Sequence, residues 1–441
     1  MLKVIDQTRE SCVRPQAFAA VLTATLAAGS AVSFAASPSH GATRSAAGDQ
    51  HIVMLGDSYA SGEAARFRGN NATDLRMRCS RHNTDLAYKP TKGFGCHYDL
   101  TKVYEKGTEQ EGECHRSPDH APIAVAARKL DMKAKNFACS GASSPHIVDR
   151  PFKQQKVSQS QLLAEWVKKK PQVKAIVLSI GGNDANVSDV AKECVTGYVK
   201  PDSVGVANRQ KCHEWQDWLD GNYKEVLGGS KVPYWGTPVG SDARGVPAAI
   251  QSVRKVMRDA GYGDGAYDFY LVGYPPPVPP SSQVIESGWA WRVKTGSCPL
   301  STRSDEGHRD DFTWFNAFDK KLNAELGSIA AANRVRFMDQ RRALDGHLLC
   351  QKGTEHPDDA AKAGASRKSE WVRFVTYNLA PLPTQGSQQE PLHPNYWGQA
   401  AMGNCYAQMI RSEHAAASCV NDKDTDQQTL RKDDVPRSPA R

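Results

Sequence analysis

A serine near the start of the sequence follows a short apolar run and could act as a nucleophile. In the stretch HIVMLGDSYASGE, the apolar run Ile52–Leu55 stops abruptly at Gly56. An apolar run that short, ended by glycine, predicts a buried strand followed by a tight turn. Ser58 would then stand at the tip of the turn, either as a helix cap or as a nucleophile. The second reading requires a base and donors for an oxyanion elsewhere in the chain.

Two further stretches offer those donors. Gly141 ends the stretch FACSG and Asn183 lies in GGND, each after an apolar run. The backbone N–H groups of Ser58 and Gly141 and the side-chain amide of Asn183 could together bind an oxyanion. Glycine lets a substrate approach the backbone closely, and the asparagine amide donates without adding a charge.

The general base should be a histidine, because imidazole titrates near neutral pH. Among the 13 histidines, His393 stands apart in QQEPLHPNYWGQ, directly before a predicted helix. Glu390 lies three residues upstream and could hold the other ring nitrogen in a tight turn. The alternative interpretation of His393 is an ordinary loop histidine.

Strands and helices that alternate after residue 50 would position these residues. Apolar runs predict strands within 51–55, 133–141, 173–184, 268–277 and 334–339, and apolar periodicity predicts helices within 117–132, 158–170, 246–263, 311–333 and 394–412. The alternation predicts an α/β fold with a doubly wound (flavodoxin-like), mostly parallel five-stranded sheet covered on both faces. Because ligands bind outside the carboxyl ends of such strands, the turns after the first three strands should converge on one crevice.

Composition and charge favour a secreted soluble protein. Of the 441 residues, 24% are charged and 39% hydrophobic, and the net charge of +8 is spread along the chain. The tightest basic run, Lys168–Lys170, is better explained as a solvated helix end than as a nucleic-acid site. Residues 1–42 have a basic start, an apolar run of small residues and an Ala-rich end, which is typical of a secretory signal peptide. No other run is long enough to span a membrane, so we expect an extracellular protein without a stable membrane anchor.

The cysteines agree with export. One of the 11 cysteines, Cys12, lies in the signal segment. The even number that remains predicts up to five disulfides in an oxidising compartment. The candidates are Cys79, Cys96, Cys114, Cys139, Cys194, Cys212, Cys298, Cys350, Cys405 and Cys419. Spacing does not give the connectivity, although short loops such as Cys194 to Cys212 are the easiest to close. No C-x-x-C or H-E-x-x-H motif occurs, and we expect no metal site.

The remaining segments indicate one domain with insertions. We place a single domain at 50–415, interrupted by long irregular, disulfide-linked insertions at 62–115, 185–245 and 275–310. The polar stretch 420–441 is expected to be a disordered tail.

The four blocks GDSY, FACSGAS, GGND and EPLHP, in this order, resemble the SGNH, or GDSL-type, hydrolases. The blocks span residues 51 to about 400, and the resemblance is strongest to secreted, cysteine-containing lipases and esterases of actinobacteria. It implies that Ser58 is the nucleophile and His393 the general base and acid. It also implies an oxyanion hole made by Ser58, Gly141 and Asn183. The family usually has Asp three residues before the histidine, so Glu390 is a departure, and some secreted relatives use a backbone carbonyl instead.

The resemblance predicts a secreted serine esterase or lipase that cleaves carboxylic esters through an acyl-enzyme, without a cofactor. The alternatives are a polysaccharide O-acetylesterase and a catalytically silent secreted binding protein. The segment YPPPVPP at 274–280, followed by Trp289 and Trp291, could form an apolar wall for the substrate. We expect a monomer that binds an ester substrate and no nucleic acid.

Overall fold

The computed structural model describes residues 49–66, 88–90, 96–98, 100–110, 112–199, 202–232, 244–285, 300–302, 309–354, 369–373, 375, 389–432 and 435. Within the chain, Ser45–Arg441 forms one compact unit. The expected signal peptide lies outside the described residues. In the described part, no helix is long and apolar enough to cross a membrane.

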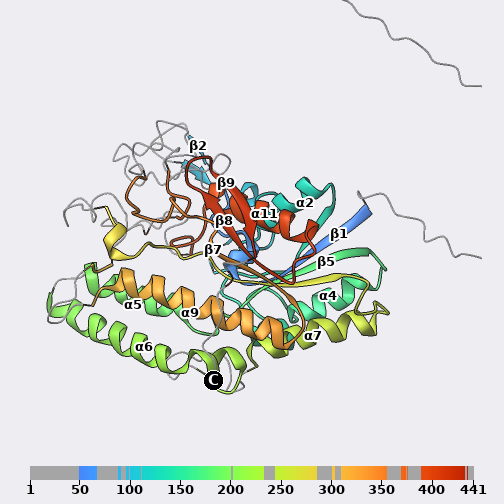
Figure 1. Ribbon diagram of the computed structural model, residues 1–441, viewed down its shortest axis with the longest axis horizontal. Coiled ribbons are helices and arrows are strands. Elements are labelled where there is room, and N and C mark those ends of the chain that lie inside the picture. The colour runs from blue at the N-terminus through green and yellow to red at the C-terminus, as the bar shows by residue number, and fades with distance from the viewer. Residues whose placement is uncertain are drawn as a thin grey trace, which may run out of the picture. The chain divides into compact units, whose positions relative to one another are not determined.

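A seven-stranded sheet with the order β4-β1-β5-β6-β7-β8-β9 lies at the centre of this unit (Figure 1). Its strands are β1 (Gln50–Gly56), β4 (Lys133–Asn136), β5 (Gln172–Ser179), β6 (Asp268–Val272), β7 (Arg336–Arg342), β8 (Ala416–Asp422) and β9 (Gln427–Arg431). All neighbouring strands are parallel except β8 and β9, which are antiparallel. The strands predicted from the sequence are β4, β1, β5, β6 and β7, in the spatial order of a flavodoxin-like sheet. The predicted doubly wound fold is therefore confirmed, with two further strands at one edge.

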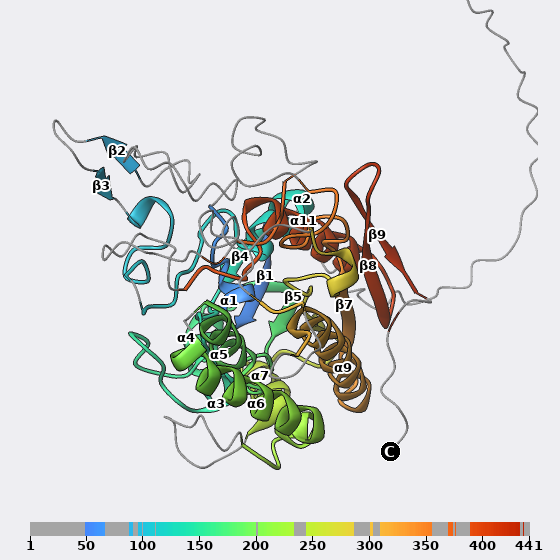
Figure 2. The same ribbon diagram turned by 90° about the vertical axis from the view of Figure 1, so that its left-hand side faces the viewer.

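Helices cover both faces of the sheet (Figure 2). They are α1 (Ser58–Ser61), α2 (Pro122–Leu130), α3 (Ser144–Val148), α4 (Gln159–Val167), α5 (Val187–Val199), α6 (Asp202–Gly228), α7 (Gly245–Asp259), α9 (Asp311–Ala332) and α11 (Tyr396–Arg411). Short 3₁₀ turns occupy Leu100–Lys102 and Ser281–Gln283, and a separate hairpin joins β2 (Tyr88–Pro90) to β3 (Cys96–Tyr98). Helices α2 and α11 pack together on one face, and α4, α7 and α9 lie on the other.

The segment 185–245, predicted to be irregular, instead contains the helices α5 and α6, which pack against each other. A disulfide joins Cys194 of α5 to Cys212 of α6, the pairing suggested by the short loop. Helix α6 is polar overall, which hides it in the sequence. It nevertheless buries Trp215, Leu219 and Tyr223, spaced four residues apart along one face.

The expected disordered tail is wrong for its first part, because residues 420–431 belong to the β8–β9 hairpin at the sheet edge. In β9 exposed residues alternate with covered ones, so only the side chains on one face need partners within the protein. On that face Asn404 and Gln408 of α11 donate hydrogen bonds to the side chain and backbone of Gln428 at 2.7 and 2.6 Å. A disulfide between Cys405 and Cys419 joins the same helix to β8.

Another disulfide, Cys114–Cys139, lies next to the expected oxyanion loop. Cys350 is also disulfide-bonded. The side chains of Cys79, Cys96 and Cys298 lie outside the described residues.

Candidate active site

A sharp turn at the end of β1 exposes Ser58 at the start of α1. Gly56 has φ +144°, and a Cβ at this position would lie 2.1 Å from the carbonyl oxygen of Ser179 on the neighbouring strand. Only glycine fits there. The side-chain amide of Gln159 both donates to Gly56 O and accepts from Gly56 N, each at 2.8 Å. The turn that presents Ser58 is therefore fixed by β5 on one side and by α4 on the other.

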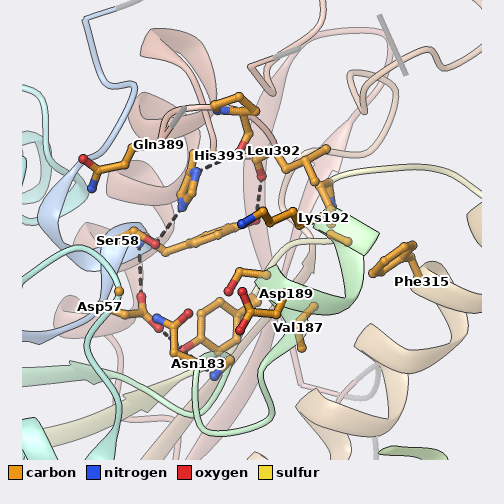
Figure 3. Close-up of a pocket in the computed structure, with 18 of the residues that line it drawn as sticks. Asp57, Ser58, Asn183, Val187, Asp189, Lys192, Phe315, Gln389, Leu392 and His393 are labelled. Carbon is orange, nitrogen blue, oxygen red and sulfur yellow. Dashed lines mark hydrogen bonds between the residues drawn. The ribbon is translucent and has the colours of Figure 1, made fainter. Parts of the chain in front are cut away.

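His393 and Ser58, which are 335 positions apart in sequence, meet at this turn (Figure 3). The Nε2 of His393 lies 2.6 Å from Ser58 Oγ, and its Nδ1 lies 2.9 Å from the carbonyl oxygen of Pro391. A carbonyl can only accept, so Nδ1 carries the proton and Nε2 is free to accept the serine proton. This is the tautomer that a general base needs.

The loop that carries His393 is tied to the nucleophile helix by a tyrosine. Tyr59, directly after Ser58, donates its hydroxyl to Leu392 O at 2.9 Å. Leu392 has φ +65°, a left-handed conformation that is uncommon for a branched residue. The aromatic ring of Tyr59 also lies 5.2 Å from the imidazole of His393. The uncommon backbone conformation at Leu392 is thus stabilised by a hydrogen bond from Tyr59 of α1.

Glu390 does not orient the imidazole, contrary to the role considered from the sequence. The Nδ1–H of His393 already donates a hydrogen bond to the carbonyl oxygen of Pro391. Glu390 is fully buried, and its Oε1 accepts a hydrogen bond from the Tyr104 hydroxyl at 3.0 Å. Leu392, which lies between Glu390 and His393, has φ +65°, and the imidazole bonds the carbonyl two residues before it. A spacing of three residues predicts nearness but not the direction of a side chain.

The three expected oxyanion donors converge on the same cavity as Ser58 and His393. Gly141 adopts φ +81°, and a Cβ there would meet nothing nearer than 3.5 Å, so its conformation rather than space requires glycine. One N–H of the Asn183 amide donates to Ala142 O at 3.0 Å. That bond orients the amide and leaves its second N–H for a ligand.

The turn after β5 is locked to the oxyanion loop by Asp184. Its carboxylate accepts from the backbone N–H of Ser144 at 3.0 Å and from the Ser144 hydroxyl. Burial raises the pKa of Asp184, and the hydrogen bonds from Ser144 oppose that rise. The loops that carry Gly141 and Asn183 are therefore connected directly.

Asp57, directly before the nucleophile, stabilises the turn through hydrogen bonds to its carboxylate. Its carboxylate accepts from the Tyr274 hydroxyl at 2.5 Å and from Tyr59 N at 3.1 Å. Burial raises the pKa of Asp57 to about 7, although these two hydrogen bonds lower it. Tyr274 begins the proline-rich segment after β6, and its hydroxyl also accepts from Gly182 N at 3.2 Å.

A cavity of about 500 Å³ opens in front of Ser58. Apolar side chains from α5, α9 and the loops after β6 and before α11 line much of it: Val187, Ala191, Val195, Pro277, Val278, Leu300, Phe315, Leu322 and Leu392. Figure 3 shows Phe315 on the far side of the cavity from Ser58 and His393, with Asp189 next to Val187. A recess that combines an apolar wall with polar groups around the reacting atoms is typical of a site for a small ligand.

A buried carboxyl group lies beside the apolar side chains of the cavity. Asp319 of α9 lines the cavity and is only 6% exposed. Within the described part of the chain, no hydrogen bond reaches its Oδ2. Burial raises the pKa of Asp319 to about 8, against the opposing charge of Arg341. Burial thus favours the neutral acid form of Asp319, which is able to donate a hydrogen bond.

The structure brings Ser58, Gly141, Asn183 and His393 together and separates Glu390 from the imidazole. Trp289 and Trp291, the proposed substrate-binding residues, lie outside the described residues. Three further features of the site are not predicted from the sequence: Tyr59, Asp319 and the wall of the cavity formed by α5. The apolar spacing of Val187, Ala191 and Val195, at intervals of four, is a helical signal that could have revealed that wall.

Comparisons with known proteins give structural matches only. No family model and no curated protein matches the sequence. Phospholipase A1 from Streptomyces albidoflavus is 19% identical, covers 82% of this chain and 99% of its own, and has a TM-score of 0.40. An extracellular lipase from Streptomyces rimosus is 17% identical, with coverage of 82% and 100% and a TM-score of 0.40. A carbohydrate acetylesterase family member from Sinorhizobium meliloti is 10% identical, with coverage of 82% and 97% and a TM-score of 0.34. In its sheet order and in the convergence of its four blocks on one Ser–His pair, the chain is similar to SGNH-type hydrolases.

Proposed function

We propose that the protein is a serine carboxylic-ester hydrolase, in which Ser58 forms an acyl-enzyme and His393 transfers the protons. The observation that carries the proposal is the hydrogen bond between Ser58 Oγ and His393 Nε2 at 2.6 Å, with the opposite ring nitrogen held by Pro391 O. A histidine on the surface has no need of one particular tautomer. A general base needs an unprotonated ring nitrogen that faces the nucleophile, as Nε2 does here.

The chemistry runs in two halves. Ser58 Oγ attacks the ester carbonyl while His393 Nε2 takes its proton, and the carbonyl oxygen gains negative charge. The N–H groups of Ser58, Gly141 and Asn183 stabilise that charge, which is the largest electrostatic contribution in such reactions. The imidazolium then gives its proton to the departing alcohol. Water, activated by His393, releases the acid from Ser58 in the second half.

The orienting group is a backbone carbonyl rather than a carboxylate. A carbonyl fixes the tautomer as a carboxylate does, but it stabilises the imidazolium with a dipole instead of a full charge. The site therefore works as a Ser–His pair held by backbone geometry. All of these groups come from one chain, so the proposed reaction needs no partner subunit, and its steps require no cofactor.

The lining of the cavity favours an acyl lipid or a similar apolar ester over an acetylated polysaccharide. Valine, leucine and phenylalanine side chains form the wall opposite Ser58, where a chain of several methylene groups could be removed from water. Each buried methylene contributes about 0.8 kcal/mol. An acetyl group would leave most of that wall unused.

Export is part of the proposal. The signal-like segment at 1–42 and the disulfides Cys114–Cys139, Cys194–Cys212 and Cys405–Cys419 support an extracellular protein.

The test is hydrolysis of p-nitrophenyl esters, from acetate to long acyl chains, by the purified protein and its Ser58→Ala variant. We expect turnover that rises from acetate to medium chains and disappears in the variant. A preference for acetate would favour an O-acetylesterase. No turnover of any ester, with no reaction of Ser58 with a fluorophosphonate, would favour a silent binding protein.

A further inference from the structure

A cluster of buried polar side chains lies beside the catalytic pair and takes no part in the reaction described above. We call Glu63, Tyr104, His115, Ser140 and Glu390 the buried cluster. Each of the five is at most 4% exposed. They come from four separate segments: the residues after α1, the loop after the 3₁₀ turn, the oxyanion loop and the loop that carries the base. Polar groups this far from water require partners.

His115 has an acceptor at each ring nitrogen. Its Nδ1 lies 2.7 Å from Glu63 Oε1, and its Nε2 lies 2.9 Å from the backbone carbonyl of Gln110. Neither a carboxylate nor a carbonyl can donate, so both nitrogens must carry protons for both hydrogen bonds to form. His115 is therefore an imidazolium, buried against the carboxylate of Glu63.

The other groups of the cluster agree with a charged pair. Burial would raise the pKa of Glu63, but the charge and hydrogen bond of His115 outweigh it and lower the pKa of Glu63. Glu390 Oε1 lies 3.9 Å from His115 Nδ1 and so places a second carboxyl group near the same imidazolium. The ring of Tyr104 stacks on His115, with centroids 4.3 Å apart.

The second oxygen of Glu63 connects this pair to the oxyanion hole. Glu63 Oε2 accepts the hydroxyl of Ser140, the residue directly before Gly141. The backbone N–H of Ser140 donates to Cys114 O at 3.1 Å, and Gln389 from the base-carrying loop donates to Ser140 Oγ at 3.2 Å. Ser140 is thus held by three segments at once. Its position sets where the N–H of Gly141 points.

We propose that Glu63 is a positioning residue, and that its pairing with the His115 imidazolium holds the Ser140 hydroxyl so that Gly141 N–H faces the oxyanion. The pair acts through Ser140 and touches no substrate. An oxyanion donor acts chiefly in the transition state. Loss of the pair should therefore lower kcat and leave KM nearly unchanged. This inference rests on the proposed ester hydrolysis at Ser58.

The decisive variant is Ser140→Ala, which removes only the hydroxyl group. We expect kcat for p-nitrophenyl butyrate to fall about tenfold, as for one charge-assisted hydrogen bond, with KM changed less than about twofold. Glu63→Gln should lower kcat at least as much, and the double variant should be no slower than Glu63→Gln alone, because the two changes break the same connection. Additive losses, or an unchanged kcat in Ser140→Ala, would overturn the proposal.

Ser418→Ala is the matched control. Ser418 is also buried and also donates its hydroxyl to a carboxylate, Asp339 Oδ2 at 2.8 Å, but it lies on β8 away from the site. It should reduce stability about as much as Ser140→Ala and leave kcat unchanged. Equal falls of kcat in both serine variants would point to a general loss of packing and against positioning.

Two readouts do not depend on the ester substrate. The first is the rate at which a fluorophosphonate labels Ser58, which should fall in Ser140→Ala as kcat does. If wild type labels but hydrolyses no ester, the proposed substrate fails while the labelling rates still test the cluster. If wild type does not label, both proposals fail.

The second readout is nitrogen NMR of histidine-labelled wild type, with His115 assigned through its contact with Tyr104. Both ring nitrogens should appear protonated at pH 7. Because an imidazolium cannot bind a metal ion, a singly protonated ring or stoichiometric metal held by Glu63, His115 and Glu390 would overturn the assignment.

Discussion

The cavity and the buried cluster flank the same Ser–His pair, and Glu63 in the cluster is hydrogen-bonded differently from Asp319 in the cavity. In the buried cluster, Glu63 accepts two hydrogen bonds, and His115 uses both ring nitrogens. In the cavity, the Oδ2 of Asp319 receives no hydrogen bond from the described part of the chain. A satisfied polar network rigidifies its surroundings, whereas a buried group without a partner is costly. We infer that the side of the site with Glu63 and His115 holds geometry and that the side with Asp319 receives a ligand.

The largest expected effect on activity distinguishes His393 from Glu390, the basic and the acidic residue of the EPLHP block. His393→Ala should lower kcat/KM by about a thousandfold or more, because the only general base is lost. Glu390→Gln should lower it by less than about tenfold, because Pro391 O still fixes the tautomer of His393. Steady-state hydrolysis of one p-nitrophenyl ester measures both. Equal losses would show that Glu390 completes a triad and would erase the distinction between cluster and catalytic pair.

The next effect concerns Asp319 and the pH dependence of stability. Its pKa is about 8 in the folded protein and about 3.9 in an unfolded chain. Between these values the unfolded state has lost the proton and the folded state keeps it, so this group makes the protein less stable as pH rises. Asp319→Asn should therefore raise the free energy of unfolding, by more at pH 8 than at pH 5. The gain should reach several kcal/mol at most, on the scale of about 1.4 kcal/mol per pH unit.

Urea unfolding of both proteins at pH 5 and pH 8 measures that gain. Asp345→Asn is a useful control: Asp345 is partly buried, and its hydrogen bond from Arg342 Nε at 2.9 Å opposes the rise in its pKa that burial causes. A gain for Asp319→Asn that is the same at both pH values would mean that Asp319 is already ionised when folded. The contrast with the buried cluster would then disappear.

A smaller effect is expected from Tyr104→Phe in the buried cluster. The hydroxyl donates to Glu390 Oε1 at 3.0 Å and accepts from Ala64 N at 3.3 Å, and the Tyr104 side chain is fully buried. Its removal should cost about 1–3 kcal/mol of stability and change kcat less than about threefold. Tyr262→Phe, which removes a half-buried hydroxyl at the surface, should cost less. A loss of activity without a loss of stability in Tyr104→Phe would assign the cluster a direct catalytic part.

The residues at the ends of the central strands could be predicted from the sequence. Ser58 and Asn183 follow apolar runs that end in glycine, and parallel strands deliver their carboxyl ends to one crevice. The order of the central sheet follows from the same alternation. His393 was placed beside them only by its position before the last helix and by the resemblance of the four blocks.

Other features depend on contacts that spacing does not encode. The Glu390 side chain is bonded to the hydroxyl of Tyr104, 286 positions away, a contact that no local pattern signals. Asp319 faces the cavity because α9 packs on the α6 side of the sheet, a matter of tertiary packing. His115 is paired with Glu63 across 52 positions. The β8–β9 hairpin was missed because its stability comes from α11 rather than from its own polar composition.

The most direct test of the Ser–His pair is to map the site of fluorophosphonate labelling by mass spectrometry of the digested protein. We predict that wild type carries the phosphonyl group on Ser58 alone. We also predict that Ser58→Ala stays unlabelled, and that His393→Ala reacts slower by orders of magnitude. Labelling of folded wild type at another serine, or equal labelling rates with and without His393, would contradict the assignment of Ser58 and His393 as nucleophile and base.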